Sequence, residues 1–154
     1  MGSGDPTHER WMTIALEQAR EAARGDEVPI GAVLVRGREE LARAHNAPIA
    51  LCDPTAHAEV LALREAARAE GAYRLPGTTL YTTLEPCSLC FGAALQARVE
   101  RIVYGAADPK GGAAGSVVDL RALAGVNHRI EVEGGVLADP AGEMLREFFR
   151  ARRT

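Results

Sequence analysis

The chain has 154 residues, of which 47% are hydrophobic, so it is long enough for one well-buried domain and short for two. Its net charge of −3 argues against a protein that coats nucleic acid indiscriminately, because such a protein needs a surplus of Lys and Arg on its contacting surface. The longest apolar runs, over 30–35 and 90–95, are far shorter than a membrane span, and we therefore expect no membrane partner.

The first half of the chain predicts a helix, a β-hairpin and a second helix, in that order. Apolar residues recur at helical spacing in the first segment, and the next two segments are strand-like with a glycine turn between them. The second helix starts after a loop at an Asp-Pro-Thr sequence and stops at a glycine. The expected elements are a helix over 8–24, strands over 29–36 and 41–46, a loop over 46–55, and a helix from Asp53-Pro54-Thr55 to Gly71 that buries Val60, Leu61, Leu63 and Ala67.

The second half of the chain continues the alternation of strands and helices. We expect strands over 78–84, 101–105 and 128–132, a third helix with Pro86 in its first turn, a turn of helix over 119–123 and a closing helix over 141–153. Alternating strands and helices imply a three-layer α/β domain in which at least part of the sheet is parallel. We expect one domain over 1–154, with a flexible segment at 1–7.

Two short motifs combine the residue types of a metal site with a free carboxylate. They are His57-Ala58-Glu59 and Pro86-Cys87-Ser88-Leu89-Cys90. The two cysteines are three residues apart, so they face the same side of a helix, and a helix start favours the thiolate form that binds zinc. His57 and Glu59 do not share a helix face, so their spacing works if the metal lies beyond the N-terminal end of the second helix. We therefore expect two helix starts to converge on one ion.

The number of metal ligands favours catalysis over a structural role. His57, Cys87 and Cys90 supply three ligands, and catalytic zinc keeps its fourth position for water, whereas structural zinc usually has a fourth side chain. Cys52, only five residues before His57, is the side chain that would close the site. Taken singly, His57 could also be a buried core histidine, and Glu59 an exposed carboxylate at a helix start.

The order of the motifs, His-x-Glu followed by Pro-Cys-x-x-Cys, is typical of zinc-dependent nucleobase deaminases. In that chemistry a zinc-bound hydroxide attacks an aromatic ring carbon that carries an amine. Glu59 is then expected to be the proton shuttle, which takes a proton from the water, passes it to a ring nitrogen and helps ammonia to leave.

The cysteine content indicates the cellular compartment. Three cysteines are an odd number, and two of them stand at metal-ligand spacing, which argues against a disulfide framework. No secretory signal is visible at the N-terminus. We therefore expect a reducing compartment, the cytoplasm.

Beyond these motifs, the sequence resembles bacterial tRNA adenosine deaminases within the cytidine deaminase-like superfamily. The resemblance covers most of the chain, in segments 28–33, 53–63, 79–105, 108–110, 112–116, 127–129 and 147–153, and at Asn46. It implies a three-layer α/β/α cytidine deaminase-like fold, with a central mixed five-stranded sheet and helices on both faces. It also implies zinc-dependent hydrolytic deamination of adenosine to inosine at the wobble position of a tRNA anticodon loop, with attack at C6, by a homodimer that holds one Zn²⁺ per subunit.

The resemblance also assigns residues to the RNA substrate. It implies that Asn46 contacts the target base and that the segments around Asp108, Phe149 and Arg152 meet the anticodon stem-loop. From the residues alone, Asn46 is a polar strand-end residue and the aromatic pair at 148–149 is a packing anchor. The basic tail is either an RNA contact or a solvated helix end. This tail comprises Arg146, Arg150, Arg152 and Arg153.

Three positions depart from the commonest pattern of that family: Leu89 replaces Met, Phe91 replaces Ala and Gly112 replaces Thr. Leu for Met conserves volume, whereas the larger Phe91 is expected to alter packing around the zinc or at the dimer contact. The superfamily motif is shared by enzymes that act on cytosine, guanine and free nucleosides, so a small-molecule deaminase is the alternative function. A structural zinc module is a third hypothesis, which requires Cys52 as a ligand and leaves Glu59 without a role.

Overall fold

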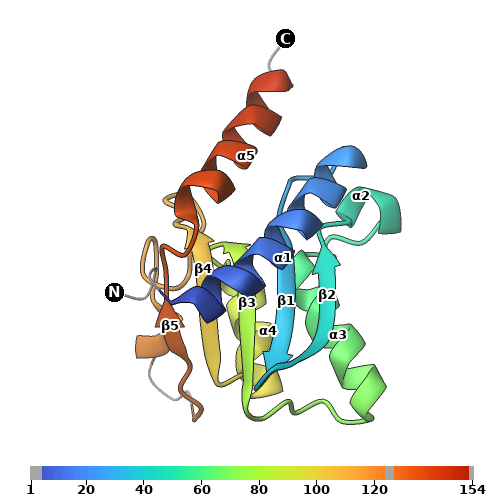
Figure 1. Cartoon of the computed structure of the whole chain (residues 1–154). Coiled ribbons are helices and arrows are strands. Elements are labelled where there is room, and N and C mark those ends of the chain that lie inside the picture. The colour runs from blue at the N-terminus through green and yellow to red at the C-terminus, as the bar shows by residue number, and fades with distance from the viewer. Residues whose placement is uncertain (1–4, 124–126, 153–154) are drawn as a thin grey trace.

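The computed structural model describes residues 5–123 and 127–152, whose strands form one five-stranded sheet flanked by helices (Figure 1). The elements in chain order are α1 (Pro6–Arg24), β1 (Gly31–Arg36), β2 (Glu39–His45), α2 (Pro48–Leu51), α3 (Ala58–Glu70), β3 (Thr78–Leu84), α4 (Ser88–Ala97), β4 (Arg101–Ala106), the 3-10 turn η2 (Leu120–Ala122), β5 (Glu131–Glu133) and α5 (Ala138–Ala151). No helix in these described ranges is long and apolar enough to cross a membrane.

The sheet is mixed, as predicted, with the strand order β2-β1-β3-β4-β5. β1 pairs antiparallel with both β2 and β3, whereas β3, β4 and β5 are parallel. The β1–β2 pair is a hairpin that turns at Gly37, where a φ of +62° favours glycine. The parallel pair β3–β4 needs a crossover, which α4 provides.

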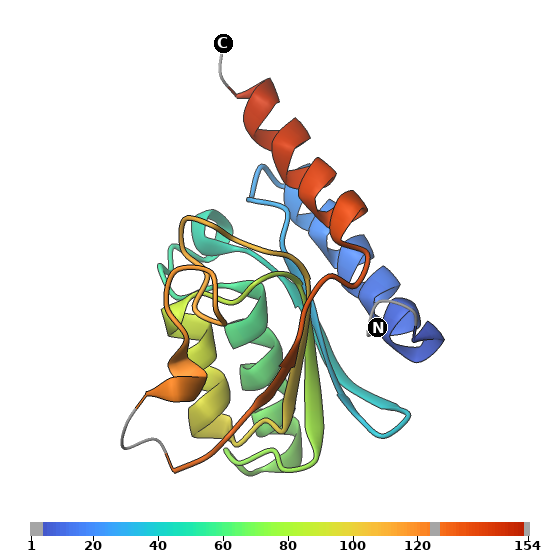
Figure 2. The same ribbon diagram turned by 90° about the vertical axis from the view of Figure 1, so that its left-hand side faces the viewer.

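The helices cover both faces of the sheet and form the predicted three layers (Figure 2). α1 and α5 lie on one face, and α3 and α4 lie on the other. Alternation along β1 divides the core: Leu34 packs with the α3 and α4 side, whereas Val33 packs with Trp11 and Met12 of α1. At the start of β1, a Cβ on Gly31 would lie 2.0 Å from the Ala15 carbonyl oxygen, so only glycine allows α1 to approach the strand this closely.

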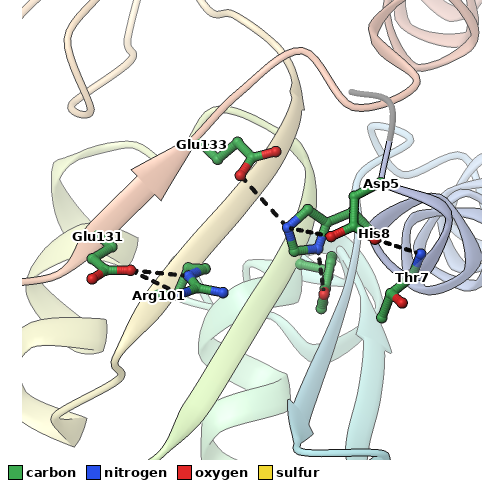
Figure 3. Close-up of polar contacts among 7 residues, drawn as sticks. Asp5, Thr7, His8, Arg101, Glu131 and Glu133 are labelled. Atoms are coloured by element: carbon green, nitrogen blue, oxygen red, sulfur yellow. Dashed lines mark hydrogen bonds and ion pairs between the residues drawn. The ribbon is translucent and has the colours of Figure 1, made fainter. Parts of the chain in front are cut away.

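A polar cluster fixes the start of α1 to the sheet, on the face opposite α3 and α4 (Figure 3). His8 Nδ1 lies 2.8 Å from the Tyr81 hydroxyl of β3, and His8 Nε2 lies 3.5 Å from Glu133 of β5. Burial raises the pKa of Tyr81 to about 12, so its hydroxyl stays protonated at neutral pH. Nearby, Arg101 of β4 forms an ion pair with Glu131 of β5 at 2.9 Å (Figure 3). These contacts join α1, β3, β4 and β5.

The chain termini depart from the expected boundaries in two places. Pro6 and Thr7 belong to the segment predicted to be flexible, but they form the first turn of α1, because the Asp5 carboxylate accepts a hydrogen bond from the Thr7 N–H at 2.8 Å. Residues 1–4 and Arg153 lie outside the described part of the chain. α5 starts three residues before the predicted position, at Ala138.

α3 begins later than the sequence predicts, and its buried face is rotated. The predicted cap Asp53 instead closes a tight turn, because its carboxylate accepts hydrogen bonds from the N–H and hydroxyl of Thr55 at 2.8 and 2.7 Å. The helix ends at Gly71, as predicted. Of the four residues predicted to be buried, Leu63 is buried, whereas Val60, Leu61 and Ala67 are half-buried. The difference arises because small side chains on another face of α3 let the helix approach the sheet closely. The buried residues of α3 are Ala58, Glu59, Ala62, Leu63 and Ala66.

Three further boundaries differ from the prediction. The expected loop over 46–55 contains α2, because the Glu27 carboxylate accepts hydrogen bonds from two N–H groups at its start, those of Ile49 and Ala50. β5 is shorter than the strand predicted over 128–132 and starts at Glu131. α4 starts at Ser88, so Pro86 precedes the helix and does not lie in its first turn.

Candidate metal centre

Three side chains predicted as metal ligands converge between the starts of α3 and α4. His57 Nδ1 lies 3.6 Å from Cys87 Sγ and 3.3 Å from Cys90 Sγ, and the two sulfur atoms are 3.7 Å apart. In the described part of the chain, these three residues form the one cluster of His, Cys, Asp or Glu suited to a metal ion. The predicted convergence of two helix starts is therefore confirmed.

The spacing of the three ligand atoms fits zinc. Tetrahedral zinc with Zn–S bonds of about 2.3 Å and a Zn–N bond of about 2.0–2.1 Å requires sulfur atoms about 3.8 Å apart and nitrogen–sulfur distances of about 3.6 Å. The observed distances of 3.7, 3.6 and 3.3 Å are close to these values. Two thiols and one imidazole are also the donor set that favours zinc over the harder cations.

The local sequence explains why both helices start at the cluster. His57 and Cys87 are the N-cap residues of α3 and α4, both in extended conformation, so their side chains lie at the helix ends and not on the flanks. Neither side chain caps its own helix by a hydrogen bond. The start of α3 is instead capped by Asn46, which lies 12 residues before Ala58 in the sequence. The Asn46 side-chain oxygen accepts a hydrogen bond from the Ala58 N–H at 2.8 Å.

The two thiols have opposite pKa shifts. The pKa of Cys87 falls to about 5, because its sulfur accepts hydrogen bonds from the Cys90 thiol and from backbone N–H groups at the start of α4. The pKa of Cys90 rises, because its thiol is the donor to Cys87 and is buried. The lowered pKa favours the thiolate form of Cys87, which is the form that binds zinc.

Glu59 is beside the cluster but is not one of its ligands. It lies in the first turn of α3 and is only 4% exposed, which excludes the alternative of a solvated helix-start carboxylate. Burial is the main cause that raises the pKa of its carboxyl group, and the nearby Cys87 raises it further. A raised pKa makes a carboxyl group a better proton acceptor, which a proton shuttle requires.

Cys52 does not close the metal site. Its side chain is exposed, its sulfur lies 3.8 Å from the Ile49 carbonyl oxygen, and it is absent from the ligand cluster. With three ligands and a buried acid beside them, the arrangement matches a catalytic zinc site and not a closed structural one.

The four residues assigned to the RNA by resemblance fall in two places. Asn46 is buried and belongs to the metal centre through its bond to Ala58. Asp108, Phe149 and Arg152 instead line one hollow of about 860 Å³, at the end of β4 and along α5. Two of these three side chains form hydrogen bonds within the protein. The Asp108 carboxylate accepts from the N–H groups of Lys110 and Gly111, and Arg152 donates to Asp26 at 2.7 Å.

The departures from the family pattern have different structural contexts. Phe91 is fully buried in the core between the sheet and α4, whereas Leu89 is 40% exposed. A Cβ at Gly112 would lie 2.3–2.5 Å from the Glu85 carboxyl group, so the threonine that is usual in the family would displace this carboxyl group. At Gly111 the nearest atom, an Asp108 oxygen, is at 3.4 Å, which is an ordinary contact.

Glu85 is the residue that the sequence analysis missed. It directly precedes Pro86-Cys87, is 1% exposed and accepts hydrogen bonds from the loop that follows β4. The available signal was a carboxylate directly after a largely buried strand, where a buried charge demands several donors.

Comparison with known sequences agrees with this site. The family described as the cytidine and deoxycytidylate deaminase zinc-binding region matches residues 5–106, which contain the ligand cluster and Glu59. The tRNA-specific adenosine deaminase of Bacillus subtilis (strain 168) is 48% identical over 145 residues, which are 94% of this chain and 90% of the relative.

Comparison with solved structures gives two informative matches. A structure from studies of A-to-I editing by tRNA:A34 deaminases at the wobble position of transfer RNA is 46% identical, with a TM-score of 0.86, over 88% of this chain and 99% of that chain. A guanine deaminase from Nitrosomonas europaea is 28% identical, with a TM-score of 0.77, over 94% of this chain and 84% of that chain.

The ligand set predicts how the cysteines differ in metal binding. Cys52→Ser is expected to retain about one zinc ion per chain, because Cys52 lies outside the cluster. Cys87→Ser is expected to weaken zinc binding, because it removes a direct ligand. The decrease in affinity should exceed roughly 10–100-fold, which is the effect of removing a residue that only hydrogen-bonds to a ligand. Elemental analysis after dialysis against a weak chelator measures both. Loss of zinc from Cys52→Ser would show that the site has a fourth protein ligand.

Proposed function

Because the chain belongs to the cytidine and deoxycytidylate deaminase family, we propose that it is a zinc-dependent hydrolase that converts adenosine to inosine at the wobble position of a tRNA anticodon loop. The observation that carries the chemistry is the His57, Cys87 and Cys90 cluster with Glu59 buried beside it. The choice of substrate rests on likeness to the tRNA-specific deaminases, which extends over most of the chain.

The side chains of the centre divide the reaction between them. His57, Cys87 and Cys90 hold the zinc ion, which when bound lowers the pKa of a coordinated water to about 7. Glu59 accepts a proton from the attacking water and delivers it to N1 of the base as the C6–O bond forms. It then takes the remaining proton from the hydroxyl group added at C6 and transfers it to the amine, so that the C6–N6 bond breaks, ammonia leaves and the C6 carbonyl forms. Hydrolysis of adenosine thus yields inosine and ammonia, and Glu59 returns to its starting state.

Asn46 is suited to contact the base with one end of its amide. Its side-chain oxygen is already bonded to the Ala58 N–H, so the amide NH₂ group is the end that can donate to a ring nitrogen of adenine. The same bond ties Asn46 to the residue between His57 and Glu59. We therefore assign Asn46 to orientation of the base relative to the metal centre.

The hollow along α5 is the proposed contact for the anticodon stem-loop. Arg146 and Arg150 of α5 and Lys110 of the facing loop line it together with Asp108, Phe149 and Arg152. Cationic side chains suit phosphates, and the half-exposed ring of Phe149 offers a stacking surface for a base. The net charge of −3 is compatible with this assignment, because a local group of cations lines the hollow.

A homodimer is supported by apolar side chains that remain exposed near the metal centre. α2, the start of α4 and the loop after β4 lie at the same end of the sheet in both views (Figures 1 and 2). Exposed apolar residues of these segments are Ile49, Leu51, Leu89, Val117 and Val118. Such a concentration indicates an interaction surface, and a second copy of the chain is the proposed occupant.

The proposal includes the organisation and location of the protein. The chain acts as one deaminase domain, in agreement with a relative that matches 94% of it. None of the three cysteines forms a disulfide, which agrees with a reducing compartment and a cytoplasmic tRNA substrate.

Deamination of a wobble adenosine tests the proposed function directly. The purified protein is expected to produce inosine in an anticodon stem-loop but not from free adenosine, cytidine or guanine, with products separated by nucleoside chromatography. Glu59→Gln is expected to lower kcat by about 10²–10⁴-fold while zinc content is kept, because it removes the proton shuttle. Deamination of guanine with untouched RNA would instead favour the small-molecule alternative, which the likeness to guanine deaminase suggests.

If the hollow binds RNA, substitution of an arginine within it should weaken RNA binding more than substitution of an arginine elsewhere. Arg150→Gln is expected to weaken stem-loop binding and to reduce the slope of log K against log salt by about 1, because one phosphate contact is lost. Arg101→Gln is the matched control, since Arg101 starts β4, whereas the hollow lies at the other end of that strand. Fluorescence anisotropy over a salt series measures both. Equal effects of the two variants would exclude a localised RNA surface.

The proposed dimer contact predicts a change in assembly state. Leu51→Glu places a charge in the exposed apolar surface and is expected to raise the dimer dissociation constant at least about tenfold, since burial of an unpaired charge is costly. Tyr73→Glu is the control, because Tyr73 is also an exposed large side chain but lies between α3 and β3. Light scattering over a concentration series distinguishes monomer from dimer. A dimer unchanged by Leu51→Glu would place the contact elsewhere.

A further inference from the structure

Glu85 is a buried carboxylate that organises the loop after β4. Its Oε1 accepts hydrogen bonds from the Asp108 N–H at 3.0 Å and from the Ser116 hydroxyl. Its Oε2 accepts from the Ala114 N–H at 3.0 Å and from the Ser116 N–H at 3.1 Å. One side chain therefore holds both ends of a loop segment that is otherwise irregular.

The charge of Glu85 is stabilised by hydrogen bonds and not by a cation. Four donors, three backbone N–H groups and the Ser116 hydroxyl, face its two oxygen atoms. Within the described ranges no Lys, Arg or His forms an ion pair with it. All four partners are donors, which is the arrangement that suits an ionised carboxylate, and each loop N–H then makes a strong, charge-assisted bond.

The loop approaches Glu85 so closely that its sequence is constrained. A Cβ on Gly112 would lie 2.3–2.5 Å from all three atoms of the carboxyl group. A larger residue at position 112 would therefore displace the carboxyl group from its donors. Four donors and the close approach of the loop backbone therefore fix the position of the Glu85 carboxyl group.

The same segment connects the loop to the metal centre and to the hollow. The Pro86 carbonyl oxygen accepts a hydrogen bond from the Ala113 N–H at 2.8 Å, one residue before the ligand Cys87. On the other side, Asp108 and Lys110 of the loop line the proposed RNA-binding hollow. Glu85 therefore lies where the chemical centre and the recognition surface meet.

We propose that Glu85 is a positioning residue for the RNA substrate, which holds the loop over 108–116 in register with the segment carrying Cys87. The proposal rests on the proposed function, because it assumes that the hollow binds RNA. Glu85 touches neither the base nor the metal. Its effect is transmitted through the loop backbone, and it sets the distance between the phosphates held at the hollow and the base held at the centre.

Glutamine in place of Glu85 separates positioning from general stability. An amide keeps one acceptor but turns an NH₂ group toward N–H donors, so part of the loop loses its partner. In Glu85→Gln we expect KM for the stem-loop to rise about tenfold, as for loss of a buried hydrogen bond, with kcat changed less than about threefold. Zinc content is expected to stay unchanged, because His57, Cys87 and Cys90 remain in place.

Hydrogen exchange gives a readout that does not depend on activity. The amides of Asp108, Ala114 and Ser116 are expected to exchange faster in Glu85→Gln, whereas amides of β1 and β3 keep their protection. Stem-loop binding is measured by anisotropy in the Glu59→Gln background, so that turnover does not interfere. Its dissociation constant should rise in parallel with KM.

Two further variants keep the test decisive. Ser116→Ala removes the hydroxyl donor alone, and we expect a smaller increase in KM, about two- to fivefold, even if Glu85→Gln does not fold. Tyr81→Phe is the matched control, because it removes a buried hydrogen bond on the opposite face of the sheet. It should lower Tm without changing KM.

The outcomes separate the two proposals. If the wild-type protein does not deaminate the stem-loop, the proposed function fails. If it does, an unchanged KM in both Glu85→Gln and Ser116→Ala overturns the positioning role of Glu85 alone. Loss of zinc from Glu85→Gln, or an equal increase in KM in Tyr81→Phe, also overturns it, because Glu85 would then act only on stability or on the metal centre.

Discussion

The geometry of the zinc ligands is the constraint on which the rest of the structure depends. Three atoms from two helices must lie within about 4 Å of one another, and both helices must therefore start at the same end of the sheet. Placement of His57 and Cys87 as N-caps satisfies this requirement, because side chains at a helix start lie beyond the helix end. The parallel β3–β4 pair then follows, since α4 must return the chain across the sheet.

Buried carboxylates, held by N–H groups, fix the loops around this centre. Glu85 holds the loop after β4, and Glu27 holds the start of α2 through the N–H groups of Ile49 and Ala50. By contrast, most ion pairs of the described chain are partly exposed, such as Arg101 with Glu131, and contribute only about 0–1 kcal/mol each. Local order near the site thus depends on satisfied buried acceptors, for which loss of a partner costs more, about 1–3 kcal/mol.

The features that depend on residues close together in the sequence could be predicted, whereas those that depend on contacts between residues far apart in the sequence were missed. The ligand cluster was predictable because Cys87 and Cys90 lie three residues apart and His57 precedes an apolar helix. The start of α3 was predicted wrongly, because its cap comes from Asn46, 12 residues earlier. Glu85 was missed for the same reason, since its donors lie 23 to 31 residues later. Helical periodicity also misplaced the buried face of α3, where alanines pack against the sheet.

The separation of chemistry from recognition explains how an acidic protein can use an RNA substrate. Glu59, the proposed proton shuttle, is buried, so its acidity is set by the protein. The arginines of the hollow are instead exposed, and within the described residues they form ion pairs only with exposed carboxylates of Glu143 and Asp26. One of these cations, Arg152, is bonded to Asp26, which is itself largely exposed. Such an exposed pair contributes little, about 0–1 kcal/mol, so exchange of the Asp26 carboxylate for a phosphate oxygen costs little. Asp26 can therefore hold Arg152 in place for RNA without opposing its binding.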